Sequence, residues 1–177
     1  MINGDYRRYR DGVLRESGIY AKGKRNSTFT EYYQDGVTPR KETPMQQGKI
    51  DGTVKTYFRN GKIEAEKEYK QSVESGRERR FDSKTGEQIF ESHYIDGKKD
   101  GEEWEIFEDA STLRSRIIRH YRNGKLDGSY RVESTRDGKP YITIEGQYTD
   151  GEKSGQWIEH NYDNNTQTCT WHGEGGA

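Results

Sequence analysis

The chain has 177 residues with a formal net charge of −1, and 34% of its residues are charged. Leu, Ile, Val and Phe contribute only 25 residues, which excludes a thick globular core, while 13 Tyr and 3 Trp supply large side chains with polar tips. The single cysteine excludes an internal disulfide, and no apolar run approaches the length of a membrane-spanning helix.

Similar segments of about 25 residues follow one another along the chain and open near residues 4, 27, 52, 76, 101, 128 and 155. Most open on a glycine, and a large side chain stands two residues later, as Tyr6, Phe29 and Trp157 do. A glycine without a Cβ lets a neighbouring ring lie close to the backbone. We therefore expect an aromatic ring on the opening glycine of each repeat.

The fifth repeat departs from this spacing. Its aromatic residues, Trp104 and Phe107, come one place later than the corresponding residues of other repeats. One extra residue in a strand is the mark of a β-bulge. The spacing predicts such a bulge near Glu102 and Glu103.

Turn-forming dipeptides punctuate every repeat. Asp11-Gly12 and Asn60-Gly61 lie within repeats, Asp96-Gly97 and Asn123-Gly124 lie between them, and residues 71–75 replace one such turn. The strand-length segments between turns predict an all-β fold, an elongated single-layer antiparallel β-meander of about seven tandem hairpin repeats. We expect one repeat domain over residues 1–172 and a disordered tail over residues 173–177.

The run Asp51-Gly52-Thr53-Val54-Lys55-Thr56-Tyr57-Phe58-Arg59-Asn60-Gly61-Lys62-Ile63-Glu64 resembles the MORN repeat in its longer bacterial variant. Similar runs begin at Asp127 and at Tyr148. This variant is typified by the YwqK-like antitoxin family. The resemblance covers residues 4 to about 172 and implies an all-β hairpin array with a binding role, often protection against a companion toxin.

Candidates for catalysis or metal binding are weak. His93 and His120 each precede a closing Tyr, but equivalent positions of adjacent hairpins lie about 9.6 Å apart, too far for a shared zinc ion. No nucleophile stands beside a base in a pattern typical of nucleophilic enzymes. We expect no enzymatic activity, no catalytic residues, no cofactor and no metal.

Charge changes sign along the chain. Residues 1–50 carry a net charge of +4, with Arg7, Arg8 and Arg10 in the first repeat, and residues 101–177 carry −5. The acidic part can steer a basic partner. The alternative is that these charges are ordinary solvent-exposed side chains without a binding role. The candidate partner-binding residues are Glu102, Glu103, Trp104, Glu105, Phe107, Glu108, Asp109, Tyr130, Tyr148 and Trp157.

The leading hypothesis is a protein-binding immunity protein, or antitoxin, that covers the active site of a cognate toxin with an aromatic sheet face. The alternative is a scaffold on an anionic phospholipid membrane. Nucleic-acid binding is not expected, because basic residues are interleaved with acidic ones. We expect a monomer or an end-to-end dimer in the cytoplasm, and export with a removed leader is the alternative location.

Overall fold

The chain is all-β in its computed structural model, which describes residues 1–108, 114–136, 139–161 and 165–173. These residues form 17 strands and contain no helix. Paired strands are antiparallel and follow one another in the chain, as in the first hairpin, where Tyr6 lies opposite Gly18. The predicted all-β meander of hairpins is thereby confirmed.

The strands divide between two compact units. Unit 1 comprises residues 1–88 and 94–97, and unit 2 comprises residues 89–93 and 98–177. Unit 1 contains β1 (Gly4–Arg10), β2 (Val13–Ala21), β3 (Lys24–Arg25), β4 (Thr28–Tyr32), β5 (Pro39–Gln46), β6 (Lys49–Ile50), β7 (Gly52–Tyr57), β8 (Ile63–Lys70) and β9 (Val73–Phe81). Strand β10 (Gln88–Ile95) contributes to both units. Unit 2 contains β11 (Lys98–Lys99), β12 (Gly101–Glu108), β13 (Arg114–Arg122), β14 (Lys125–Arg136), β15 (Lys139–Thr149), β16 (Glu152–Asn161) and β17 (Thr166–His172).

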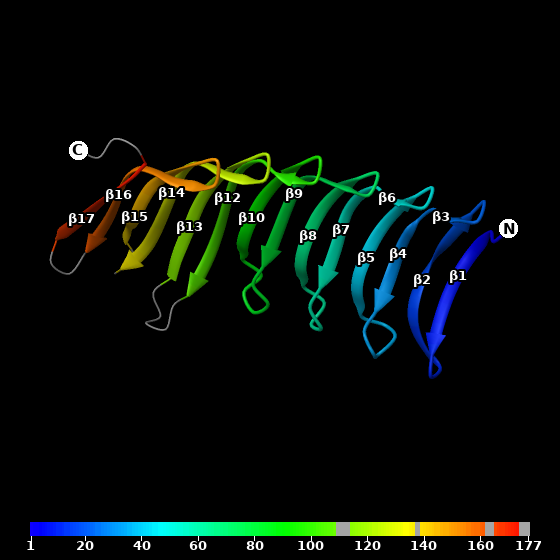
Figure 1. Ribbon diagram of the computed structural model, residues 1–177. Coiled ribbons are helices and arrows are strands. Elements are labelled where there is room, and N and C mark those ends of the chain that lie inside the picture. Colours follow the sequence, from blue (N-terminus) through cyan, green and yellow to red (C-terminus); the bar gives the residue numbers. More distant parts are fainter. Residues whose placement is uncertain (109–113, 137–138, 162–164, 174–177) are drawn as a thin grey trace. The chain divides into compact units, whose positions relative to one another are not determined.

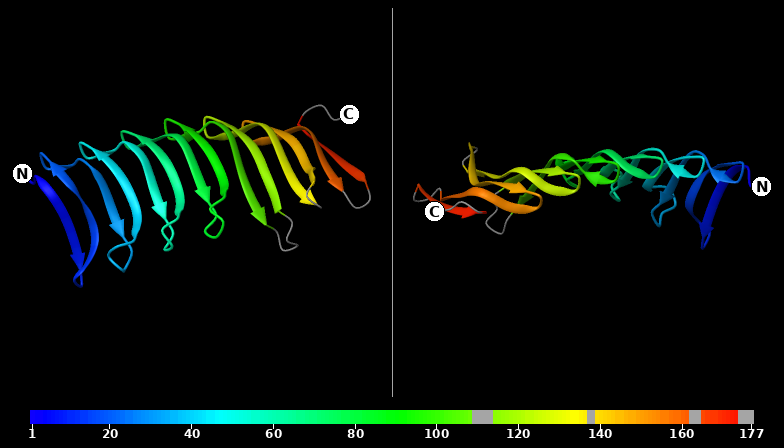
Figure 2. Two further views of the ribbon diagram at one scale, coloured as in Figure 1. Left: turned by 180° about the vertical axis from the view of Figure 1, so that it is seen from behind. Right: turned by 45° about the horizontal axis from the view of Figure 1, so that its top comes forward.

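Within each unit the strands form a single layer (Figure 1, Figure 2). Unit 1 contains the hairpins β1–β2, β4–β5 and β7–β8, and the turn after β9 is closed by a hydrogen bond from the Asp82 N–H to the Glu87 carbonyl. Unit 2 contains the hairpins β12–β13, β14–β15 and β16–β17. A single layer has no second sheet to bury its side chains, so each hairpin packs against its neighbour.

The turns that join successive repeats share one backbone geometry. At Asn123 and Gly124, φ is +51° and +86°, and at Gln71 and Ser72 it is +51° and +71°. Two successive left-handed residues define the hairpin turn whose twist matches that of the flanking strands. The third repeat therefore makes the same turn without glycine, within the segment that the sequence marked as irregular.

Each of these turns also bonds to the preceding repeat through its backbone. The Gly48 N–H donates to the Arg25 carbonyl in unit 1, and the Gly151 N–H donates to the Leu126 carbonyl in unit 2, both at 2.8 Å. These bonds involve no side chain. The junction between repeats is thus the same wherever a left-handed turn can form.

The expectation of a ring on each opening glycine was wrong. The opening glycines have left-handed φ values, +118° at Gly52, and a Cβ built there would meet Pro44 rather than an aromatic ring. The rings lie instead on Gly18 and Gly146, two residues before a closing Tyr. Opening glycines are therefore required by backbone conformation, and ring packing requires a second, separate set.

In unit 1, the ring of Phe29 packs on Gly18 and is 1% exposed; a Cβ on Gly18 would lie 2.7 Å from it. Tyr20 meets Phe29 edge-on with 5.4 Å between ring centroids, and Tyr6 lies 5.4 Å from Tyr20. The guanidinium of Arg25 lies 4.3 Å above the Phe29 ring. Aromatic contacts and a cation–π contact together form this buried cluster.

Unit 2 repeats the arrangement with other side chains. Trp157 is 5% exposed and packs on Gly146, where a Cβ would lie 2.3 Å from its indole. Tyr130 and Tyr148 lie 5.3 and 5.2 Å from the Trp157 ring, and the Lys153 ammonium lies 4.1 Å above it. The spacing of glycine, Tyr, cation and ring is the same in both clusters, so the packing is a property of the repeat.

The bulge predicted near Glu102 and Glu103 is absent from the structure. Strand β12 pairs with β13 in unbroken register from Gly101 to Glu108. Glu103 takes the buried position that rings occupy in other repeats, and Trp104 points to the opposite face because side chains alternate along a strand. A buried carboxylate, rather than an extra residue, accounts for the late aromatic residue.

Replacing Gly146 with Ala tests the packing of a ring on glycine. The new methyl group collides with Trp157, so we expect the free energy of unfolding to fall by about 2 kcal/mol. Chemical denaturation measures this change. In a Trp157→Val background the same substitution should cost much less, and an equal loss in both backgrounds would contradict the ring-on-glycine account.

Candidate partner-binding groove

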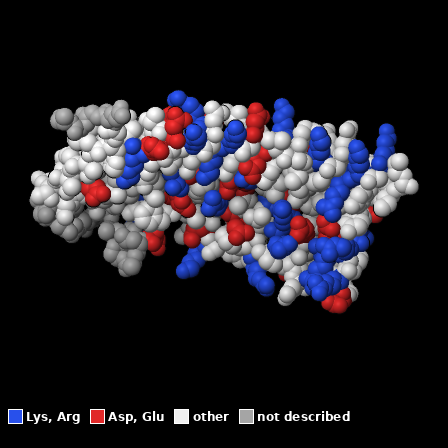
Figure 3. Space-filling view, viewed as in Figure 1, with Lys and Arg blue, Asp and Glu red and all other residues white. Residues whose placement is uncertain are grey.

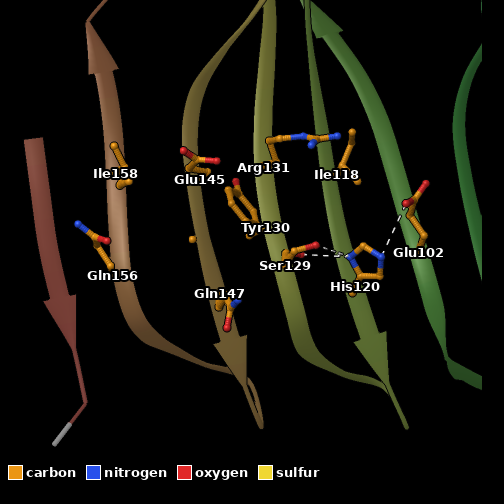
Figure 4. Close-up of a pocket in the computed structure, with 11 residues that line it drawn as sticks. Glu102, Ile118, His120, Ser129, Tyr130, Arg131, Glu145, Gln147, Gln156 and Ile158 are labelled. Atoms are coloured by element: carbon orange, nitrogen blue, oxygen red, sulfur yellow. Dashed lines mark hydrogen bonds and ion pairs between the residues drawn. The ribbon is translucent and has the colours of Figure 1, made fainter. Parts of the chain in front are cut away.

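A groove of about 490 Å³ lies over strands β12 to β16 of unit 2 (Figure 4). Its lining combines amides, hydroxyls, paired charges and apolar side chains. The lining residues are Glu102, Ile118, His120, Ser129, Tyr130, Arg131, Glu145, Gly146, Gln147, Gln156 and Ile158. The groove combines apolar walls with several polar groups, a combination typical of binding sites.

The face of the sheet that carries the groove follows from the register of β14 and β15. Gln147 and Ser129 lie opposite each other on neighbouring strands, and both are exposed. Their neighbours Gly146 and Tyr130 also lie opposite each other, and adjacent residues of a strand face opposite sides. The groove and the Trp157 indole are therefore on opposite faces of one sheet.

The amides of Gln147 and Gln156 make no side-chain hydrogen bond to any described residue, and both side chains are exposed. The charged residues around them are already paired. The Arg131 Nε lies 2.9 Å from the Glu133 carboxylate, and His160 Nε2 lies 3.2 Å from that of Glu145. The groove thus presents unused amide donors and acceptors with little uncompensated charge.

His120 makes the contact that most resembles catalytic machinery. Its Nδ1 lies 3.0 Å from the Ser129 hydroxyl, and its Nε2 lies 3.7 Å from the Glu102 carboxylate (Figure 4). A carboxylate, a histidine and a serine in this order resemble the catalytic triad of a nucleophilic hydrolase. The comparison therefore depends on whether Nδ1 can accept the serine proton.

The same Nδ1 also lies 3.3 Å from the Ser129 carbonyl oxygen, which can only accept a hydrogen bond. Only the tautomer with its proton on Nε2 would leave Nδ1 able to accept the serine proton. His93 makes the equivalent contact with the Glu102 carbonyl at 3.2 Å. The contact recurs one repeat earlier, which favours a structural role for both histidines.

The predicted partner-binding residues are dispersed. Glu102 lines the groove, and Tyr130, which borders it, belongs with Tyr148 and Trp157 to the ring cluster on the other face. Trp104 is half-buried beneath the guanidinium of Arg116, 4.5 Å from its ring. Phe107 and Glu108 are exposed near the end of β12, and Asp109 lies outside the described residues.

Glu103, another predicted contact residue, has an exposed fraction of 0%. It forms ion pairs with Lys99 and with Arg119, whose Nε lies 2.7 Å from its carboxylate, and Arg119 also reaches Glu105 at 3.2 Å. Burial alone would raise the pKa of the Glu103 carboxyl, but Lys99 and Arg119 hold it below its ordinary value. This carboxylate is paired within the repeat and is not accessible to a partner.

Sequence reasoning missed Gln147, Gln156 and Ile158, because an exposed glutamine carries no chemical signal by itself. A positional signal does exist. Gln147 directly precedes a closing Tyr, and Gln156 directly follows an opening glycine. Residues at these two positions line the same face in successive repeats, as His120 and Ser129 also do.

Comparisons with known proteins leave the family open. No protein-family model and no curated protein matches the chain. Within the described residues, no cluster of three or more His, Cys, Asp or Glu side chains could hold a metal ion. None of the described segments is a helix long and apolar enough to cross a membrane.

Replacing Glu103 with Gln tests the buried ion pairs. Lys99 then loses its counter-charge and Arg119 keeps only Glu105, and we expect the free energy of unfolding at pH 7 to fall by about 3 kcal/mol. Because the folded-state pKa is lowered, the contribution is present above the ordinary value of 4.5 and disappears as the pH falls through the folded-state value. Denaturation curves at pH 7 and in acid measure the difference.

Glu108→Gln is the matched control, because Glu108 is an exposed carboxylate on the same strand. Its effect should stay within about 0.5 kcal/mol at both pH values. A Glu103→Gln protein that is as stable as this control at pH 7 would show that the ion pairs contribute nothing.

Proposed function

We propose that the protein is a non-enzymatic binding module, a MORN-like repeat protein whose unit 2 groove holds a segment of a protein partner. The observation that carries this proposal is the pair of unengaged amides, Gln147 and Gln156, between apolar walls. An amide both donates and accepts hydrogen bonds, as a peptide group does. A polypeptide is the ligand class that matches such a lining along its length.

The walls of the groove support the same partner class. Ile118 is 8% exposed and Ile158 is half-buried. Apolar and aromatic anchors surrounded by polar groups are typical of protein interfaces. The internal pairing of Arg131 with Glu133 leaves hydrogen bonding and shape as the main determinants of fit.

A cognate bacterial toxin is the partner that we propose. The resemblance to the YwqK-like antitoxins supports it, and so does the net charge of −5 over residues 101–177, which would attract a basic protein. Occupation of the toxin's active site would neutralise it by steric exclusion. The protein itself then needs no catalytic group.

The double variant Gln147→Ala/Gln156→Ala tests the groove. Candidate toxins encoded by neighbouring genes are purified and titrated against the protein, with calorimetry for affinity and toxin activity as a second readout. Loss of both amides should weaken binding at least about tenfold and restore toxin activity in proportion. Both side chains are exposed, so the fold should be unaffected.

Gln46→Ala in unit 1 is the matched control, since Gln46 is also an exposed glutamine at the end of a strand. It should bind like the unmodified protein. Equal affinities for the double variant and the control would remove the groove from the interface. Failure of every neighbouring gene product to bind would contradict the toxin assignment.

A further inference from the structure

A second hollow of about 490 Å³ lies in unit 1, between the first two hairpins. Its lining is rich in arginine, drawn from β1, β2 and β5, and is separate from the groove of unit 2. The lining residues are Arg8, Arg10, Asp11, Arg15, Glu31, Tyr32, Gln34 and Arg40. Lys and Arg side chains are prominent over this end of unit 1 (Figure 3).

Two of the arginines are held in place by a single N–H each. The Arg8 Nε donates to the Glu16 carboxylate at 3.3 Å, and the Arg15 Nη1 donates to the Tyr33 carbonyl at 3.2 Å. A guanidinium has five N–H donors in a fixed planar arrangement. Each of these side chains is therefore anchored on one side and keeps further donors for a ligand.

The other two arginines also keep N–H donors that a ligand could use. The Arg40 Nη2 donates to Glu31 at 2.5 Å and leaves its remaining N–H groups unused. The Arg10 side chain is 80% exposed, and its one ionic contact with the described residues, to Asp11, is 3.9 Å long. A contact of that length at an exposed site holds the guanidinium weakly.

The charges of the lining do not balance. Four guanidinium groups face the hollow with two carboxylates, those of Asp11 and Glu31. Glu16 lies behind them, buried, and is shared with Arg25 at 2.9 Å. Gathering like charges costs free energy, which a bound anion would recover.

We propose that this hollow binds a phosphate group. Several guanidinium forks can hold the oxygens of one phosphate through paired, charge-assisted hydrogen bonds, and arginine is the residue best suited to that geometry. The hollow has room for a pyrophosphate or for the head group of a phospholipid. The chemistry is the same for both sources, and the proposal does not depend on the groove of unit 2.

The test uses the full chain and two probes. Inorganic pyrophosphate is titrated by calorimetry at low ionic strength, and phosphatidylcholine vesicles with and without phosphatidic acid are used for co-sedimentation. Pyrophosphate should bind with an affinity that falls as salt is added. Binding to the phosphatidic acid vesicles as well would identify a membrane head group as a source, and binding to pyrophosphate alone would identify a soluble phosphate.

Two variants address the pocket itself. Arg10→Ala/Arg40→Ala removes two guanidinium groups, and Gln34→Glu places an extra negative charge at an exposed lining position without removing a contact between described residues. Each should weaken pyrophosphate binding at least about tenfold. Thermal denaturation establishes that each variant is folded.

Arg122→Ala is the matched control, because Arg122 is 72% exposed and lies in unit 2. Its affinity for pyrophosphate should stay within about twofold of the unmodified protein. Absence of pyrophosphate and vesicle binding would overturn the proposal. Equal weakening by Arg122→Ala would also overturn it, because the binding would then reflect net charge alone.

Discussion

The structure depends on how a single-layered sheet buries its side chains without a second layer. A side chain near the start of a repeat is buried over the neighbouring hairpin, and the chain uses chemically different groups for this purpose. Phe29 and Trp157 pack as rings on Gly18 and Gly146. Glu103 occupies the corresponding position as a carboxylate neutralised by cations from adjacent strands. In both cases a large or charged group leaves water because a neighbouring strand supplies what it needs, a glycine surface for the ring or cations for the carboxylate.

The hairpin architecture was predictable because its determinants are local. A dipeptide such as Asn123-Gly124 favours the left-handed turn whatever surrounds it, and the structure has that turn. Which residue of the fifth repeat is buried was not predictable from local sequence. The spacing of its aromatic residues suggested a bulge, but the structure has a regular strand with Glu103 buried. A carboxylate can be buried there because Lys99 and Arg119 neutralise it. Those partners become visible only when the strand register is known.

Some residues of the two candidate sites could be predicted from the sequence, and others could not. The sequence pointed to Glu102 and Tyr130 in the acidic part of the chain and to Arg8 and Arg10 in the basic part, and these residues do line the two hollows. It gave no reason to join Gln147 with Gln156, or Arg15 with Arg40, because only strand pairing brings such distant positions together. Charged and aromatic residues attract attention in a sequence, whereas an exposed glutamine gains meaning only from its neighbours in space.

The backbone hydrogen bonds at the junctions bear on how such a chain changes its length in evolution. Gly48 bonds to the Arg25 carbonyl and Gly151 to that of Leu126 with the same geometry, although the side chains around them differ. A duplicated or deleted segment of one period would find the same bonds at its new boundaries. Repeat number can therefore vary without redesign of the joints, and the side chains of each copy can change independently of them.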